Sequence, residues 1–200
     1  MAEEEIKKRR KLIVIGGSSG GLEALLIILS LLHKDFTIPV IIVLHRGQVS
    51  DGGLIEVLSS KCTLQVKEAD EKDMLLPGWI YVAPPDYHLL VEKSGTVSLD
   101  VSEKVFYSRP SIEVCFLSAA LAFRENLIAV LLSGANADGA EAMGYVKKTG
   151  GITIVQDTQD ALVPYMPEQA ITISPIDMIL PAQDIAELLN RYSADVLKNC

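Results

Sequence analysis

Two unbroken apolar segments place the tightest limit on how this chain can fold. The stretches "VIIVL" (40–44) and "LIAVLL" (127–132) have no polar side chain on either face of a strand. Such strands are typical of the centre of a parallel sheet, because helices cover both of its faces. Shorter β-branched runs alternate with helix-like segments along nearly the whole sequence, as crossover connections require. The pattern predicts an α/β fold with a doubly wound, mostly parallel sheet and helices on both faces, Rossmann-like in its three layers.

The same periodicities predict the individual elements. We expect strands at 12–15, 40–44, 64–66, 79–82, 127–132, 152–155 and 178–180. We expect helices at 22–32, 54–60, 111–123, 139–148, 167–171 and 184–197. The segment "YHLLVEKSGTVSLDV" (87–101) differs, because two alternating runs flank Lys93-Ser94-Gly95. It predicts an antiparallel hairpin inserted in the α/β pattern.

Size and charge indicate one domain that does not bind nucleic acid. A chain of 200 residues with 49% hydrophobic content can build one large core. We expect a charged N-terminal tail at 1–11 and one domain at 12–200. The net charge of −8 is spread along the chain and leaves no basic stripe for a phosphate backbone. Nucleic acid is therefore not an expected partner.

Hydropathy indicates a protein that is not embedded in a membrane, and cysteine spacing indicates a reducing environment. No segment reaches the roughly 18 consecutive apolar residues of a membrane span. Cys62, Cys115 and Cys200 lie far apart without CxxC spacing, which favours neither a disulfide framework nor a zinc site. A reducing cytoplasm fits this cysteine usage best.

The glycine-serine loop after the first predicted strand, "IGGSSGG" (15–21), is the first candidate site. Its glycines do not have the spacing of a dinucleotide-binding fingerprint, and Leu22 stands where a phosphate-binding P-loop needs lysine. The loop does contain G-x-S-x-G at 16–20, between a strand and a helix, as a nucleophile elbow requires. Ser18 is then a candidate nucleophile, and the glycines would clear space around it. A glycine-rich turn with no further role is the alternative, and the neighbouring Ser19 could cap the following helix.

A serine nucleophile needs a base, and His33, His45 and His88 are the histidines of the chain. His45 directly follows the buried-type strand at 40–44, so it is expected at the same sheet edge as Ser18. A structural role for His45 is equally open. His33 is expected at an exposed helix end, and His88 in a structural hydrogen bond at the start of the hairpin.

The stretch "LLSGANADGAEAM" (131–143) supplies an acid. Asp138 lies in a loop of small residues that follows the strand at 127–132, just before a helical segment. Its ordinary role would be to cap that helix. Yet Ser18, His45 and Asp138 are all expected at the carboxyl edge of one sheet, where together they could form a catalytic triad.

Six motifs in this order resemble the catalytic domain of the chemotaxis protein-glutamate methylesterases, which are also protein-glutamine deamidases. The resemblance covers nearly all of 12–197. Its motifs are "VIGGSSGG", "VLH", "LPGWIYVAPPDYHLLV", "SRPSIEVCFLSAA", "LLSGANADGAEAM" and "GGITIVQDTQDALVPYMPEQAI". The resemblance implies that Ser18 is the nucleophile, His45 the general base and Asp138 the residue that orients the histidine.

The resemblance also implies a substrate and partners. The substrate is a methylated glutamate, or a glutamine, on the helical cytoplasmic region of a chemotaxis receptor, and a cognate methyltransferase is a conceivable further partner. No metal or organic cofactor is implied. Full-length members carry a receiver domain first, whereas only residues 1–11 precede the first predicted strand here. Phosphorylation control is therefore expected to come from elsewhere.

The sequence departs from the family pattern at two places. Arg46 and Gly47 follow the histidine, where the family usually has Met-Pro. The aspartate loop has Ala135 and Asn136 where the family usually has Met-Gly. Ala135 can still present a backbone N–H to an oxyanion, whereas Asn136 in place of glycine can alter the conformation of the loop.

Two other kinds of function remain open on the sequence. One is a serine esterase for small carboxylic esters, and the other is a catalytically silent adaptor that binds a receptor tail or a methyltransferase. An ordinary α/β-hydrolase, in which the acid precedes the histidine, would need His88 as base and Asp51 or Asp73 as acid. Nothing around those residues supports that assignment.

Overall fold

A parallel sheet with the predicted strands lies at the centre of the molecule. A computed structural model describes residues 11–45 and 53–198, with side chains described up to residue 196. Within those ranges the seven-stranded sheet has the order β3-β4-β2-β1-β7-β8-β9, and every neighbouring pair is parallel. Its strands are β1 (Leu12–Gly17), β2 (Val40–Leu44), β3 (Gln65–Glu68), β4 (Trp79–Val82), β7 (Leu127–Leu131), β8 (Ile152–Gln156) and β9 (Met178–Leu180).

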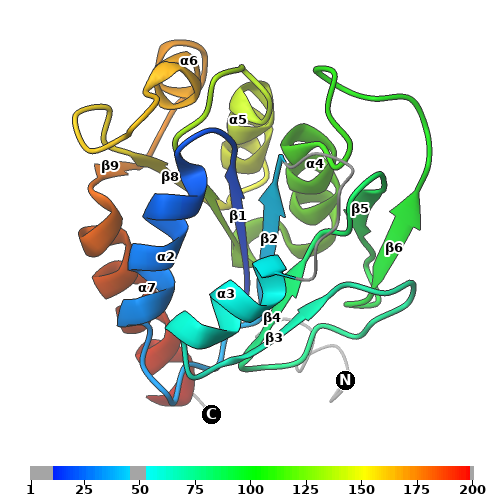
Figure 1. Ribbon diagram of the computed structural model, residues 1–200, viewed down its shortest axis with the longest axis vertical. Helices are drawn as coiled ribbons and strands as arrows, with labels where there is room; N and C mark the ends of the chain where they lie inside the picture. The colour runs from blue at the N-terminus through cyan, green and yellow to red at the C-terminus, as the bar shows by residue number, and fades with distance from the viewer. Residues whose placement is uncertain (1–10, 46–52, 199–200) are drawn as a thin grey trace.

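Helices cover both faces of this sheet, as Figure 1 shows. One face carries α2 (Gly21–Leu31), α3 (Gly53–Lys61) and α7 (Ala182–Lys198). The other carries α4 (Ile112–Phe123), α5 (Ala140–Lys148) and α6 (Tyr165–Ile173), with a short 3-10 helix, η1 (Arg124–Asn126), after α4. The predicted doubly wound α/β fold is confirmed.

The central strands send alternate side chains into two cores. In β1, Ile13 and Ile15 belong to the core shared with α2 and α7, while Leu12 and Val14 belong to the core shared with α4 and α5. All four side chains are buried. A polar side chain at any of these positions would lose its water without gaining a partner, which explains the unbroken apolar runs.

The order of the strands reverses beside β1, which lies between β2 and β7. The register pairs Gly17 with Leu44 and Gly16 with Leu131. The residues that follow these strands therefore leave the sheet at nearly the same level. In open α/β sheets such a reversal at the carboxyl edge is where ligands bind.

The predicted hairpin is confirmed as a separate two-stranded sheet. Strands β5 (His88–Val91) and β6 (Val97–Asp100) are antiparallel, and β5 packs beside α4 (Figure 1). The hairpin therefore widens the helix layer on that face and leaves the order of the main sheet unchanged.

Predicted and observed bounds differ by a few residues. Strand β3 begins at Gln65 instead of 64 and α7 at Ala182 instead of 184. Helix α6 begins at Tyr165 instead of 167, because Pro167 lies in its first turn, where a missing N–H breaks no helical hydrogen bond. Residues 1–10 of the predicted tail, and Arg46, Gly47, Asp51 and Cys200, lie outside the described residues. No helix in the described part of the chain combines the length and apolarity needed to cross a bilayer.

Candidate active site

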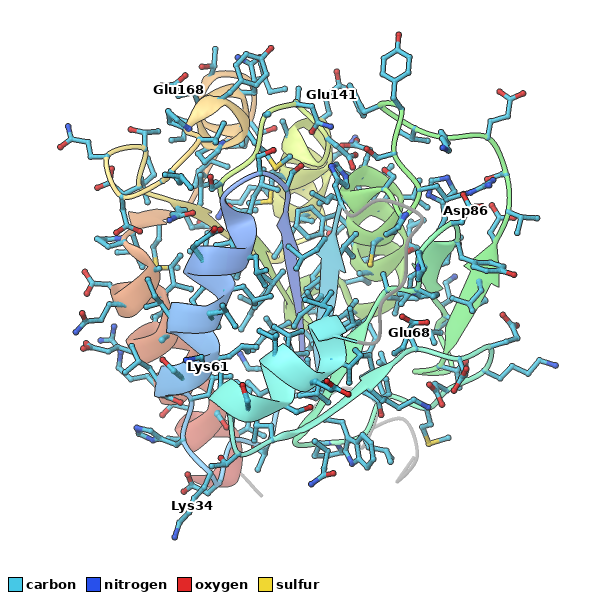
Figure 2. All side chains as sticks on the ribbon, in the orientation of Figure 1. Lys34, Lys61, Glu68, Asp86, Glu141 and Glu168 are labelled. Carbon is cyan, nitrogen blue, oxygen red and sulfur yellow. The ribbon has the colours of Figure 1, made fainter. Side chains whose placement is uncertain are left out.

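The carboxyl edge of the sheet forms the end of the molecule at the top of Figure 2. Glu141 and Glu168, in the first turns of α5 and α6, lie at that end, and Lys34 lies at the opposite one. The loops after β1, β2 and β7 all leave the sheet at this edge. The three residues predicted for a triad are in these loops.

Ser18 is the first residue beyond β1, and backbone hydrogen bonds fix it on both sides. Its N–H donates to Ser133 O at 2.9 Å, and its carbonyl accepts the Gly21 N–H at 2.8 Å. Gly20 has a φ of 77°, in the left-handed region that favours glycine. Ser18 is half-buried, and among the described residues its hydroxyl forms no hydrogen bond. The loop therefore holds the serine in place and leaves its hydroxyl available.

Ser19 does not cap the helix that follows it. The N-cap of α2 is Gly20, and no side chain caps that helix end. The Ser19 carbonyl instead accepts the Ser133 hydroxyl at 2.8 Å, while its side chain is exposed. Its structural part is to tie the loop after β1 to the loop after β7.

The glycine at 16 makes room for a helix and not for the nucleophile. A Cβ on Gly16 would lie 2.4 Å from Ile112 Cγ2, and a Cβ on Gly139 would lie 2.5 Å from the same atom. Ile112 is the first residue of α4. Both glycines therefore allow the N-terminus of α4 to approach the end of β1 and the loop after β7.

His45 and Asp138 are in direct contact. His45 follows β2, and its N–H donates to Gly17 O at 3.2 Å. Its Nε2 lies 2.8 Å from Asp138 Oδ2, and the two side chains are 11% and 0% exposed. The structure therefore joins two of the predicted residues and places the third, Ser18, at the end of the adjoining strand.

Asp138 does not cap its own helix, because the N-cap of α5 is Gly139 and no side chain caps that end. It caps α4 instead. Its Oδ1 accepts the Ser111 hydroxyl at 2.8 Å and the Glu113 N–H at 3.0 Å, and its Oδ2 accepts the Ile112 N–H at 2.7 Å. With His45, these contacts fill about four lone-pair sites, all that a carboxylate has. The N-terminus of a helix also favours a negative charge, so α4 orients the carboxylate that faces the histidine.

Ser111 is a residue of this site that the sequence analysis missed. It is fully buried, it is the N-cap of α4, and its hydroxyl bonds Asp138. A serine directly before an apolar helical segment is a recognisable capping signal. That signal predicts the helix start, but it does not predict a contact with a carboxylate 27 residues away.

Asn136 forms a second link between the aspartate and the histidine. Its Oδ1 accepts the Asp138 N–H at 3.1 Å, and its Nδ2 lies 3.5 Å from His45 Nδ1. The asparagine that replaces the usual glycine of the family therefore contacts both partners of the couple.

Glu113 brings a second carboxyl group close to Asp138. Its Oε2 accepts the Ala142 N–H at 3.1 Å. Burial raises the pKa of Glu113 to about 7, and the negative charges of Asp138 and Glu141 also raise it. Glu113, whose own N–H binds Asp138, therefore carries a carboxyl group with a pKa near neutral pH.

The other two histidines have structural positions. His88 is fully buried, its Nδ1 accepts the Ser111 N–H at 3.2 Å, and its Nε2 lies 3.0 Å from Glu103 O. Both ring nitrogens are thus occupied by backbone groups, and Asp73 pairs with Lys67 instead. His33 is exposed just beyond α2, as predicted. An α/β-hydrolase arrangement with His88 as base has no support in this geometry.

The cysteines and acidic residues form no further centre in the described chain. Cys62 and Cys115 are free thiols, and burial raises the pKa of both. Across residues 11–45 and 53–198, no three His, Cys, Asp or Glu side chains gather closely enough to hold a metal ion.

Comparison with known proteins gives consistent matches over most of the chain. The family model described as CheB methylesterase matches residues 13–189. A putative protein-glutamate methylesterase/protein-glutamine glutaminase of Leptospira interrogans is 44% identical over 177 residues, which are 88% of this chain and 92% of that protein. The protein-glutamate methylesterase/protein-glutamine glutaminase of Borreliella burgdorferi is 39% identical, over 86% of this chain and 45% of its own length. The chain thus spans nearly all of the first relative and less than half of the second.

A solved structure matches the fold. The crystal structure of the Thermotoga maritima CheB methylesterase catalytic domain has a TM-score of 0.87 and 35% sequence identity with this chain. The match covers 92% of this chain and 98% of that one.

Proposed function

Because this chain belongs to the CheB methylesterase family, we propose that it removes methyl groups from glutamate γ-methyl esters of a chemotaxis-type receptor and deamidates glutamine at such sites. The observation that carries the proposal is the contact between His45 Nε2 and the buried Asp138 carboxylate. This couple lies at the end of the strand that adjoins Ser18. A serine, a histidine and an oriented acid at one sheet edge are the groups that acyl transfer requires.

In the first step Ser18 Oγ attacks the γ-carbonyl carbon of the substrate, and His45 accepts the hydroxyl proton. Since Nε2 of His45 faces Asp138, Nδ1 is the ring nitrogen that accepts this proton. The carbonyl π electrons move onto oxygen and produce a tetrahedral oxyanion. Ala135 supports this step, because it is exposed and its N–H has no acceptor in the described part of the chain.

In the second step the oxyanion collapses and the bond to the methoxy group breaks. His45 gives its proton to the methoxy oxygen, which leaves as methanol; when the substrate is glutamine, the amide nitrogen takes the proton and leaves as ammonia. Water, deprotonated by the same histidine, then attacks the glutamyl ester of Ser18. When that ester breaks, His45 returns the proton to Ser18 Oγ, which restores the Ser18 hydroxyl and releases the glutamate side chain as a carboxylate. The scheme uses protein side chains, a backbone N–H and water.

The partners and the location follow from the substrate. The receptor helix that carries the methyl ester is the macromolecular partner, and a methyltransferase that adds the same group is a second one. Receptor methylation sites lie on the cytoplasmic side of the membrane in this proposal, so the protein acts in the cytoplasm.

The deciding experiment measures methanol release from receptor membranes carrying labelled methyl groups. Wild type is compared with Ser18→Ala, and circular dichroism verifies that the variant is folded. We expect wild type to release methanol and Ser18→Ala to release none above the buffer rate. Turnover of short-chain esters without methanol release by wild type would instead identify a small-ester hydrolase. A folded wild type that does not react with a fluorophosphonate probe would identify a silent adaptor.

A further inference from the structure

Asn136 bonds to the backbone of Asp138 on one side and faces the His45 ring on the other. We propose that Asn136 is a positioning residue, which favours the tautomer of His45 with the proton on Nε2 and occupies Nδ1 until Ser18 takes its place. This inference rests on the proposed esterase function for its kinetic consequence. Its structural part concerns His45 in the free protein and stands without a substrate.

The orientation of the Asn136 amide follows from its backbone partner. A backbone N–H can only donate, so the Asn136 atom that lies 3.1 Å from Asp138 N must be the carbonyl oxygen Oδ1. The other end of the amide is then the NH2 group. This group is the one that lies 3.5 Å from His45 Nδ1.

The tautomer of His45 follows in turn. The amide NH2 group can only donate, so Nδ1 must present its lone pair to it. A neutral imidazole carries its single proton on the opposite nitrogen, which is Nε2. Nε2 lies 2.8 Å from Asp138 Oδ2, a carboxylate oxygen that can only accept. Each of the three contacts in this ring therefore pairs a donor with an acceptor, and the ring begins and ends on Asp138.

The lengths of these contacts show which one can exchange. The His45 contact with Asp138 has the length of a strong hydrogen bond, whereas the Asn136 contact at 3.5 Å is at the outer limit. Ser18 needs the same Nδ1 lone pair, and its hydroxyl forms no hydrogen bond in the described structure. Substrate binding would then exchange the donor on Nδ1 from Asn136 to Ser18 while Asp138 keeps the ring in place.

A purely structural role is the alternative, since an Asn side chain often stabilises a loop by accepting the N–H two residues later. Asn136→Asp separates the two roles. Aspartate keeps the acceptor for the Asp138 N–H and nearly the same volume, but it presents an oxygen to Nδ1 in place of a donor. Nδ1 can satisfy that oxygen only by holding a proton, which removes the lone pair that accepts the Ser18 proton. Asn136→Gly, the usual residue of the family, removes both contacts and introduces no opposing group.

The kinetic experiment compares these variants on labelled receptor membranes and on a small ester. We expect Asn136→Gly to lower kcat roughly fivefold, the change that one net hydrogen bond corresponds to. We expect Asn136→Asp to lower kcat by about a hundredfold or more, as loss of a general base does. KM should change less than about twofold in both, because the substrate gains no contact and loses none.

A matched control is available at the other end of the molecule. Asn190 also has both ends of its amide bonded, to the His33 N–H and to Leu31 O. Asn190→Asp makes the same chemical change there and should leave kcat unaltered. If Asn136→Asp keeps the kcat of wild type or of Asn136→Gly, Asn136 only supports the loop and the inference is wrong.

Nitrogen-15 NMR of the histidine side chains tests the inference without turnover. The chain has three histidines, and His33→Gln helps to assign them. In the substrate-free wild type we expect His45 to show a protonated Nε2 and an unprotonated Nδ1. In Asn136→Asp the Nδ1 nitrogen should carry a proton as well. A proton on Nδ1 in wild type would overturn the inference even if methanol release is normal, whereas absent methanol release with the expected spectrum would overturn only the proposed function.

Discussion

Glu113 and Asp138 cap one another's helices. Asp138, just before α5, accepts the Ile112 and Glu113 N–H groups of α4, and Glu113, in the first turn of α4, accepts the Ala142 N–H of α5. Each carboxylate stabilises the positive end of a helix dipole, but the two negative charges repel each other. These reciprocal hydrogen bonds hold the start of α4 against the start of α5, at the edge of the sheet where His45 lies.

The pKa of Glu113 predicts a pH-dependent stability. Its folded value of about 7 lies above the ordinary value of 4.5, so in this interval the folded chain binds more protons than the unfolded chain. The free energy of unfolding therefore falls as pH rises from about 4.5 to about 7 and levels off above that. Glu113→Gln cannot ionise and should not show this loss. We expect the variant to exceed wild type by about 1–2 kcal/mol at high pH, less than the full shift implies because solvent screens the group.

Urea unfolding of both proteins across this pH range provides the measurement. Glu23→Gln, in the exposed first turn of α2, controls for the loss of one carboxylate. Parallel stability curves for wild type and Glu113→Gln would contradict the prediction.

Ser111→Ala should weaken both the fold and the site. The change removes the N-cap of α4 and one buried hydrogen bond to Asp138. We expect the free energy of unfolding to fall by about 1–3 kcal/mol. We also expect kcat to fall, because one oxygen of the carboxylate that orients His45 loses a donor. Chemical denaturation and methanol release measure the two effects.

The control for Ser111→Ala is Ser30→Ala, an exposed serine that bonds Ile27 O within its own helix. It should change stability by less than about 0.5 kcal/mol. Equal effects of the two substitutions would show that the contact with Asp138 contributes nothing.

Gly16→Ala should displace α4. The added Cβ would lie 2.4 Å from Ile112 Cγ2, so the helix start must move away from the end of β1. We expect a loss of about 1–3 kcal/mol of stability, as overpacking causes, together with a loss of methanol release. Gly53→Ala is the matched control, because a Cβ there meets nothing within 4 Å.

A double substitution tests whether contact with Ile112 causes the losses expected for Gly16→Ala. Ile112→Ala removes the atom that the new Cβ meets, so Gly16→Ala should cost less in that background than in wild type. Additive losses, measured in a double-mutant cycle by chemical denaturation, would mean that the clash with Ile112 is not responsible.

Replacing Phe106 and Tyr107 with residues that favour their turn should stabilise the protein. Val105 and Ser108 exchange two backbone hydrogen bonds around these residues, whose φ values are 48° and 61°. Positive φ at both central positions defines a type I′ turn, which favours Asn-Gly. Tyr107 is 98% exposed, so its side chain gains little from packing in return. The double substitution F106N/Y107G should raise the free energy of unfolding by about 1–2 kcal/mol.

Thermal or urea unfolding of the F106N/Y107G variant measures this gain. The single substitution Tyr107→Ser keeps the unfavourable turn and should give no gain. A lower stability for the double variant would show that the aromatic side chains stabilise the turn.

The local pattern of apolar and polar residues in the sequence was sufficient to predict the fold. Strands buried on both faces must be apolar throughout, so the runs at 40–44 and 127–132 reveal a parallel centre without further information. Parallel strands end at a common edge, so Ser18, His45 and Asp138 could be assigned to that edge from their places in the sequence. The hairpin followed in the same way from its alternating runs.

The sequence by itself thus determined the elements, their class of sheet and the edge at which the candidate residues lie. Only the tertiary structure decided which groups of α4 and of its N-cap residue are bound by Asp138. A capping signal in the sequence points to a helix that begins a few residues away. The capping contacts of Asp138 are instead with Ser111, Ile112 and Glu113, 25 to 27 residues away. The tertiary structure also decided which nitrogen of His45 faces the acid and that Asn136 faces the other. Hydrogen bonds act over about 3 Å, and which groups come that close depends on how helices pack across the sheet, as Ile112 does against Gly16 and Gly139.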